Sequence, residues 1–498
     1  MSADLERRRS LLTATLGFTL LDACGKPEPP EQRHVMGGAV MAEVAAGAIL
    51  AVIRIVLVLA GNVYVHLWDT PSYLVASRRP LQTLLFDPYR PPTYPLVLNL
   101  VGSDERWVII IQTVVASFSW LVLAFALAAW FPHRRLRWAA LLSFYLLSFA
   151  APVLQWDYIV YAESLSLSLF ALMTACVFRY ARERRSADLY WLALLSIPFA
   201  LARDSNILAC AVVGAFVGWL RPAERGARWA QFTALAVLLI VVPLLVGWSL
   251  MSTARGESST INVIFTRVAT EPRLLHHMVS RYGMPRSALA CAGVLEWDCR
   301  HDVAEFRAWI ADRGRSSYIR LLLTHPGFAA RSAFRSWHAA VGGVGVERDG
   351  DLERIRREQA RQPKVRAMPL IEGLGSSHWL VRSVAKGCAR LTFTWLIARL
   401  GPSAGRVLSA VPFVVLAVLL VASHTIRTQP SIVVPALFFA AVVIFQLPVV
   451  LLDADGIPRH ALLASISVNH LTVYLLLMCV SRAASGARPV RAAAPVHA

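Results

Sequence analysis

Charged residues are scarce in this chain of 498 residues, where Asp, Glu, Lys and Arg make up 16% of the sequence. Ordinary soluble domains contain about 25%. Hydrophobic residues make up 56% of the chain, and its mean hydropathy is +0.53. These values lie well outside the range of soluble globular proteins. The composition therefore predicts an all-α polytopic membrane protein.

Two kinds of motif are absent. The seven cysteines show no C-x-x-C spacing, which argues against a zinc site or a redox motif. No Gly-rich phosphate loop of the Walker type and no nucleotide-sugar pattern is present. If the protein transfers a chemical group, these absences favour a donor substrate that is carried in the membrane over a soluble nucleotide donor.

Acidic residues are also few, 31 against 50 Lys and Arg, which gives a formal net charge of +19. The arginines fall in short runs between apolar segments, as the positive-inside rule requires. The runs at 132–137, 179–185 and 221–228 mark cytoplasmic ends. The basic charge thus records topology, and no nucleic-acid partner is expected.

The apolar segments predict about ten membrane spans with both termini in the cytoplasm. Two of the ten form a short hairpin, because Arg203 and Asp204 interrupt a stretch whose two ends both carry basic flanks. The expected spans are 43–62, 106–130, 138–154, 159–178, the two arms of 189–220, 229–251, 405–423, 431–452 and 460–480.

This topology divides the chain into regions. A cytoplasmic tail, 1–42, precedes a membrane domain, 43–251, whose first outer loop covers 63–105. A large extracytoplasmic helical region, C-terminal spans and a second cytoplasmic tail follow at 252–404, 405–481 and 482–498. In the first loop, 72–86 is expected to form an amphipathic helix, and the proline-rich segment 87–95 an irregular turn.

A carboxylate stands just beyond the first expected span, in Trp68-Asp69-Thr70-Pro71-Ser72-Tyr73. Asp69 is the first acid after the span, and Pro71 favours the first turn of a helix. An aromatic residue before the acid and a proline after it place the carboxylate at the outer water interface. Asp69 is therefore the candidate general base for an acceptor hydroxyl.

Further ionisable residues lie beside other spans, and the expected topology places all of them outside. Glu163 lies about one turn into the fourth span, where contact with lipid would cost up to about 3 kcal/mol. It therefore faces protein, water or a ligand, and a simple pairing with Arg203 stays open. The other members of this one-sided set are Asp157, Asp204, Asp453, Asp455, Arg459 and His460.

Several stretches resemble a known family. They are Trp68 to Tyr73, the aromatic and acidic start of the fourth span from Tyr158 to Ser166, the turn at Ala202-Arg203, Gly283-Met284-Pro285, His325-Pro326-Gly327, and Asp453 to His460. Together with the span layout they are similar to GT-C type glycosyltransferases, including actinobacterial members. These multi-span enzymes take a sugar from a polyprenyl-phosphate carrier.

The resemblance implies an inverting glycosyltransferase of the plasma membrane with an extracytoplasmic active site. A polyprenyl-phosphate-linked sugar would be the donor, and a cell-envelope glycan, a lipid or a protein the acceptor. Asp69 would be the base. The leaving phosphate would be stabilised by Arg203, Arg459 and His460. The substrate site would be completed by Tyr73, Asp157, Glu163 and Asp204.

A divalent cation, Mg²⁺ or Mn²⁺, is an open option, because Asp453-Ala454-Asp455 has the spacing of a metal-binding acid pair. In the region 252–404, Cys291 and Cys299 could form a disulfide if that region lies outside the cytoplasm. The spacing of the two cysteines permits this bond without requiring it.

Two other functions stay open. A polysaccharide polymerase or ligase would use basic residues of the outer region: Arg273, His276, His277, Arg281 and Arg286. A lipid or solute transporter would show broken helices in both halves of the chain. Only one interrupted segment, 202–206, is recognisable in the sequence.

Overall fold

The computed structural model folds the chain almost entirely into helices. The described residues are 30–60, 69–85, 90–220, 225–251, 254–296, 299–341, 383–384, 387–388, 390–422, 433–452 and 462–486. No element among them is a β-sheet strand, which confirms the all-α prediction for this part of the chain. Two units are distinguished, Met1–Leu50 and Ala51–Ala498, and their border lies inside helix α2 (Pro30–Ala60).

Six helical stretches in the described part are long and apolar enough to cross a membrane. They are Met41–Leu59, Glu105–Ala128, Ala162–Glu183, Arg225–Gly247, Ala404–Val421 and Leu462–Arg482. Three shorter apolar helices are α10 (Ser186–Ala200), α11 (Asn206–Trp219) and α24 (Val434–Phe445). These helices make the chain a multi-pass membrane protein, whereas the total of ten spans stays a prediction.

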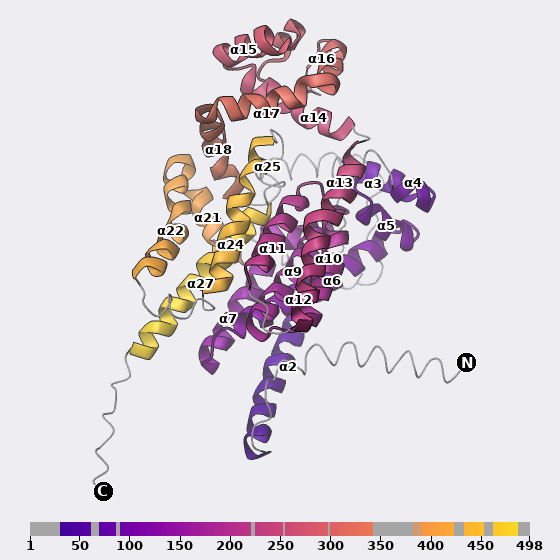
Figure 1. The fold of residues 1–498 in the computed structure, drawn as a ribbon. Coiled ribbons are helices and arrows are strands. Elements are labelled where there is room, and N and C mark those ends of the chain that lie inside the picture. The colour runs from indigo at the N-terminus through magenta and orange to yellow at the C-terminus, as the bar shows by residue number, and fades with distance from the viewer. Residues whose placement is uncertain are drawn as a thin grey trace. The chain divides into compact units, whose positions relative to one another are not determined.

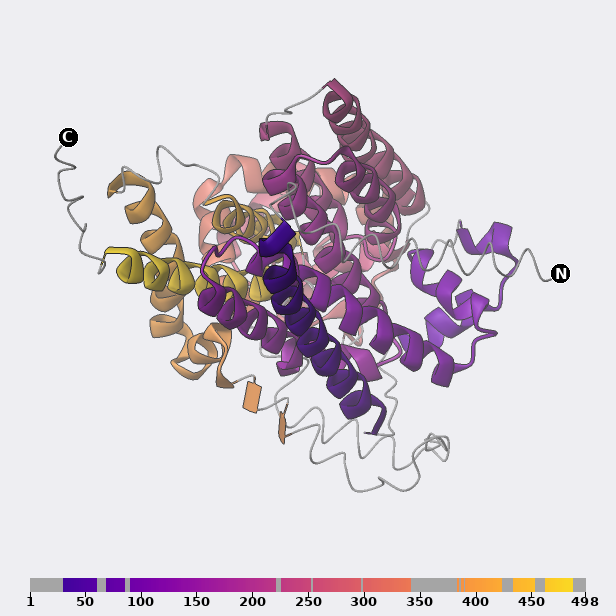
Figure 2. The ribbon, with the colours of Figure 1, turned by 90° about the horizontal axis from the view of Figure 1, so that it is seen from below.

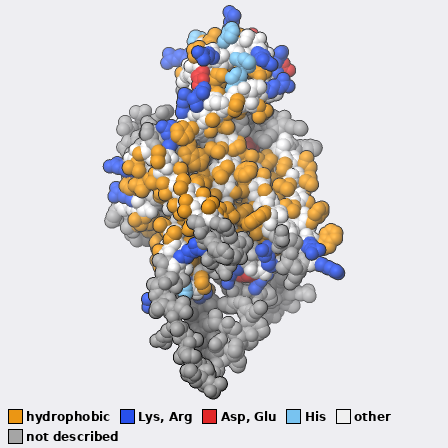
Figure 3. Space-filling model, turned by 60° about the vertical axis from the view of Figure 1, so that its left-hand side comes forward, with side chains coloured by type: hydrophobic (Ala, Val, Ile, Leu, Met, Phe, Trp, Pro, Cys, Tyr) orange, Lys and Arg blue, Asp and Glu red, His pale blue; other side chains and the backbone are white. Residues whose placement is uncertain are grey.

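The surface agrees with this assignment. Figure 3 shows hydrophobic side chains covering the middle of the face in view, with Arg and His side chains gathered on the lobe above. Helix α22 (Gly401–Ala422) exposes valines at helical spacing: Val407, Val411, Val414, Val418 and Val421. A stripe of exposed aliphatic side chains is stable against lipid and unfavourable in water.

Inside unit Ala51–Ala498, long helices pack around aromatic side chains. Helix α6 (Glu105–Ala128) packs against α9 (Ala162–Glu183) and α7 (Arg134–Leu146), and α24 packs against α27 (Leu462–Gly486) (Figure 1). Large side chains of these helices that are fully buried include Trp120, Tyr145, Phe170, Phe178 and Tyr474. This packing fixes the helix ends from which the candidate site is built.

The third expected span, 138–154, is not one continuous helix. α7 (Arg134–Leu146) is followed by a short turn, Leu147–Phe149, and then by α8 (Ala151–Leu154). Ala150 is extended, with ψ 144°. Pro152 has no N–H to donate to the carbonyl of Ser148, and the Arg54 guanidinium donates to that carbonyl instead, at 3.4 Å.

The expected hairpin is present as two separate helices, α10 and α11, joined by the turn at residues 201–205. Asn206 begins the second arm, and its Nδ2 donates to the carbonyl of Phe199 at 2.6 Å. The same amide donates to Ser166 Oγ of α9 at 2.8 Å. One buried asparagine thus closes the turn and ties it to α9.

The first loop forms three short helices, α3 (Thr70–Ser77), α4 (Leu81–Leu85) and α5 (Thr93–Leu100). They lie together beside the long helices in both views (Figures 1 and 2). The expectation of an irregular turn through residue 95 was wrong, because α5 begins at Thr93. Pro95 fits there, since the first-turn N–H groups of a helix have no partner within the helix.

Residues 254–341 form a helical lobe, described except for 297–298. Its helices are α14 (Ala254–Val263), α15 (Pro272–Tyr282), α16 (Ala304–Trp309), α17 (Arg315–Thr324) and α18 (Pro326–Val341). Phe265, Met278, Phe306 and Leu321 are fully buried in its apolar core. The lobe therefore has a core of its own, distinct from that of the long helices.

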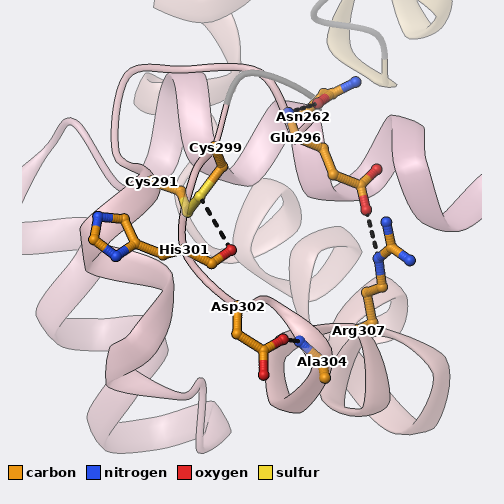
Figure 4. Close-up of a disulfide and its surroundings, with 8 residues drawn as sticks. All are labelled: Asn262, Cys291, Glu296, Cys299, His301, Asp302, Ala304 and Arg307. Atoms are coloured by element: carbon orange, nitrogen blue, oxygen red, sulfur yellow. Dashed lines mark hydrogen bonds and ion pairs between the residues drawn. A yellow bond between two sulfur atoms is a disulfide. The ribbon is translucent and has the colours of Figure 1, made fainter.

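A disulfide joins Cys291 to Cys299 in this lobe (Figure 4), which settles the pairing that the sequence left open. Polar contacts anchor the same loop. Asn262 Oδ1 accepts from the N–H of Glu296 at 2.7 Å, and the Glu296 carboxylate pairs with Arg307 Nε at 2.7 Å. The loop between α15 and α16 is thus held by a covalent bond and by two polar contacts.

Candidate functional site

Asp69 lies directly before α3, and its carboxylate contacts two described residues from distant parts of the sequence. Arg90 Nη2 lies 2.5 Å from Oδ1, and the Tyr161 hydroxyl donates to Oδ2. The backbone carbonyl of Asp69 accepts from the N–H groups of Ser72 and Tyr73 at 3.1 and 3.2 Å. Of the Asp69 side chain, 28% is exposed.

Arg90 precedes α5 and holds the loop together. Its Nε donates to Ser72 Oγ at 2.6 Å, and its guanidinium carbon lies 4.9 Å from the centre of the Tyr73 ring. Burial acts to lower the pKa of Arg90, but the Asp69 carboxylate and two tyrosines raise it above its ordinary value. The guanidinium therefore stays charged while it is partly shielded from water.

Three buried tyrosines form the wall beside this pair. Tyr73 contacts Tyr94 and Tyr161 edge-on, with ring centroids 5.2 and 5.4 Å apart. Burial, and next the charge of Glu163, raise the pKa of Tyr73 well above its ordinary value. Tyr73 is therefore neutral at physiological pH and cannot serve as a base.

A second acid and arginine pair lies close to the first. Glu163, in the first turn of α9, is 1% exposed and lies 3.5 Å from Arg203 Nη2, whose side chain is 13% exposed. Both residues contribute to the electrostatic field at Tyr73, as do Asp69 and Arg90. The structure thus brings together four of the predicted residues: Asp69, Tyr73, Glu163 and Arg203.

Asp157 has different partners. It is 1% exposed, and its carboxylate pairs with Arg54 Nη2 at 2.6 Å and accepts from Ser164 Oγ at 2.7 Å. The sequence reasoning overlooked Arg54, although it is the only charged residue between Val44 and Ala60. A lone arginine in a first span is a signal for a buried acidic partner.

Gln112 of α6 anchors the segment that carries Tyr161. The Gln112 side-chain amide donates to the carbonyls of Trp156, Asp157 and Ile159 at 3.2, 2.7 and 2.9 Å. Thr70 Oγ1 donates to the carbonyl of Val160 at 3.0 Å. The first loop and the start of α9 are therefore fixed to each other where Tyr161 meets Asp69.

The remaining predicted residues divide into two groups. Asp204 is partly exposed in the turn between α10 and α11. Outside the described residues lie Asp453, Asp455, Arg459 and His460. Among described residues, no group of three or more His, Cys, Asp or Glu side chains could hold a metal ion. Asp453 and Asp455 are therefore still the candidate metal ligands.

Comparisons with protein-family models, with curated proteins and with solved structures found no match for this chain. The similarity to GT-C enzymes therefore rests on the stretches quoted from the sequence. The activity that this similarity implies is therefore a proposal.

Proposed function

We propose that the protein is an inverting membrane glycosyltransferase that moves a sugar from a polyprenyl-phosphate carrier to a glycan, lipid or protein acceptor. The observation that carries the proposal is the accessible Asp69–Arg90 pair, with Tyr161 on the same carboxylate and Glu163–Arg203 close by. A carboxylate can accept a hydroxyl proton, and arginines can bind a departing phosphate.

The reaction would be a single displacement. The acceptor oxygen attacks the anomeric carbon and forms the new C–O bond, while its proton passes to the Asp69 carboxylate. The bond from the anomeric carbon to the phosphate oxygen breaks, and the polyprenyl phosphate leaves with the electron pair. Arg203 and Arg90 would stabilise that negative charge.

Arg90 has a further part in this scheme. A carboxylate bound to an arginine is a weak base, because the arginine favours its charged form. A bound phosphate competes for the same guanidinium, and its arrival draws Arg90 away from Asp69. Donor binding would thus both seat the phosphate and restore the basicity of Asp69 for the acceptor hydroxyl.

The proposed location is the plasma membrane, with about ten spans and the site on the extracytoplasmic side. The disulfide Cys291–Cys299 supports this side for the α14–α18 lobe, because such bonds persist in oxidising compartments. A divalent cation at Asp453 and Asp455, and phosphate binding by Arg459 and His460, remain part of the proposal.

Asp69→Asn tests the function. The change is nearly isosteric, so the protein should be made in normal amounts, and transfer from a radiolabelled polyprenyl-phosphate sugar should fall at least ~100-fold. Asp312→Asn is the matched control, because Asp312 is exposed and lies in the lobe. Undiminished transfer by Asp69→Asn would remove the proposed base.

The same assay separates the alternative functions. A polymerase or ligase would move preassembled chains rather than single sugars, and a transporter would move labelled substrate across a vesicle membrane without forming a new glycosidic bond. The size of the labelled product and its side of the membrane distinguish the three outcomes.

A further inference from the structure

Helix α15 has two unlike faces. Leu274 and Met278 are buried in the core of the α14–α18 lobe. On the other face, Arg273, His276 and Arg281 are exposed. With Ser280, the polar face carries arginines, histidines and a serine and no acid between Arg273 and Arg281.

Histidines from two elements meet on this face. The rings of His277 and His325, which lies between α17 and α18, have centroids 4.8 Å apart. The ring of Tyr282 lies edge-on to His277 at 5.4 Å. His277 Nε2 is buried without a hydrogen-bond partner among the described residues. We call Arg273, His276, His277, Arg281 and His325 the α15 cationic face.

The described acids of the lobe have partners outside the α15 cationic face. Glu257 pairs with Arg315, Glu271 with Arg331 and Arg335, Glu296 with Arg307, and Asp312 with Arg313. Asp302 accepts from the N–H of Ala304, and Glu305 from Ser287 Oγ. Among the described residues no ion pair joins an acid to the α15 cationic face, which leaves its charge available for a ligand.

The position of this face selects the kind of ligand. Figure 1 shows α15 on the side of the lobe away from the long helices, with α17 between them. The α15 cationic face therefore belongs to an element that lies away from the apolar helices. A water-soluble chain with repeated negative charges fits the geometry, because several separate cations can then bind one molecule.

We propose that the α15 cationic face binds an acidic polymer, bearing phosphate or carboxylate groups, and holds it as the acceptor for the transferase. Arginine binds either anion through two parallel hydrogen bonds. The acceptor role rests on the proposed function, whereas the binding itself does not.

Binding is measured with the full chain in nanodiscs of zwitterionic lipid. The probes are fluorescent polyphosphate, fluorescent polyglutamate and neutral dextran. We expect binding of at least one acidic polymer and not of dextran. The double change Arg273→Gln with Arg281→Gln should weaken that binding at least tenfold, the effect of about 1.4 kcal/mol.

Arg300→Gln with Arg320→Gln is the matched control, because it removes the same charge from exposed residues of the same lobe. The control should change binding by less than about threefold at constant salt. Equal losses in both variants, or no preference for acidic polymers over dextran, would overturn the proposal. A preference for polyphosphate would assign a phosphodiester acceptor, and a preference for polyglutamate a carboxylate one.

The result is independent of the transferase assay, because it needs no donor. Asp69→Asn should bind the polymer normally while losing transfer. Loss of polymer binding in the Arg273 and Arg281 variant, with transfer to a short uncharged acceptor retained, would locate the defect in acceptor capture. If that double variant unfolds at a lower temperature than the parent, Arg281→Glu replaces it.

Discussion

Two arginine–aspartate pairs in this protein have nearly the same geometry and opposite surroundings. Arg54 and Asp157 lie 2.6 Å apart with their side chains 0% and 2% exposed. Arg90 and Asp69 lie 2.5 Å apart, but 20% and 28% of these side chains are exposed. The nitrogen–oxygen distance therefore does not distinguish the two pairs. The exposure of their side chains does.

The difference follows from the cost of separating the charges. A fully buried ion loses its hydration, so each partner is needed to keep the other inside the protein. In a partly exposed pair each ion can exchange its partner for water at little cost, and the arginine can exchange it for a phosphate. Arg54–Asp157 therefore fits a structural role, and Arg90–Asp69 fits one in which the partners separate during a reaction.

The largest effect is expected at the buried pair. Arg54→Met removes the partner of Asp157, and the loss of folding free energy should be about 3–5 kcal/mol. Melting of the purified protein in detergent, followed by size-exclusion chromatography, measures the change. The double variant Arg54→Met with Asp157→Leu should recover most of the loss. An unchanged melting temperature in the single variant would contradict the structural role.

The pair Glu163–Arg203 lies between the two extremes, because the acid is buried and the arginine is partly exposed. Arg203→Gln should cost about 2 kcal/mol of stability, less than at a fully buried pair, and should raise the KM for the donor. Glu163→Gln added to it should restore the stability. If the double variant also shows a normal KM, Arg203 has no contact with the phosphate.

A substitution in the Arg90–Asp69 pair should lower activity and leave stability nearly unchanged. Arg90→Lys keeps the charge but cannot contact Ser72 and Asp69 at once. The KM for the donor should rise about tenfold, equivalent to 1.4 kcal/mol. The melting temperature should stay within about 3 °C of the parent. A fall in stability as large as that of Arg54→Met would make the two pairs equivalent.

The two acids of this comparison are recognisable in the sequence, whereas their arginine partners are not. Asp69 was identified because it is the first acid after an apolar span, and Glu163 and Arg203 because charged side chains are unfavourable in lipid. The broken hairpin also followed from that rule. Such arguments use local sequence, so they find the residues of a site but not their pairing.

The partners of these acids could not be predicted, because local sequence does not show which distant residues meet in the fold. Arg90 and Tyr161 meet Asp69 across 21 and 92 residues of sequence, and Gln112 holds a turn more than 40 residues away. Asp157 was grouped with the site because the topology places it outside, although its partner is Arg54. Only packing decides which of several acids near one membrane surface faces a substrate.

The smallest predicted effect concerns His277, whose buried Nε2 has no hydrogen-bond partner among the described residues. Burial, followed by the charges of His325, Arg281 and His276, lowers the pKa of His277 below its ordinary value. Tyr282 is the other group against its ring.

Because the unfolded chain then binds a proton at a higher pH than the folded lobe, stability should fall as pH drops through the ordinary histidine range. The stability is fully present above that range. Between pH 7.5 and 5.5 the resulting decrease in the melting temperature should be below about 3 °C, and His277→Gln should reduce it. A polyanion bound to the α15 cationic face favours the protonated ring, so polyphosphate should also reduce the decrease. Acid sensitivity that neither His277→Gln nor polyphosphate alters would assign the titration to another group.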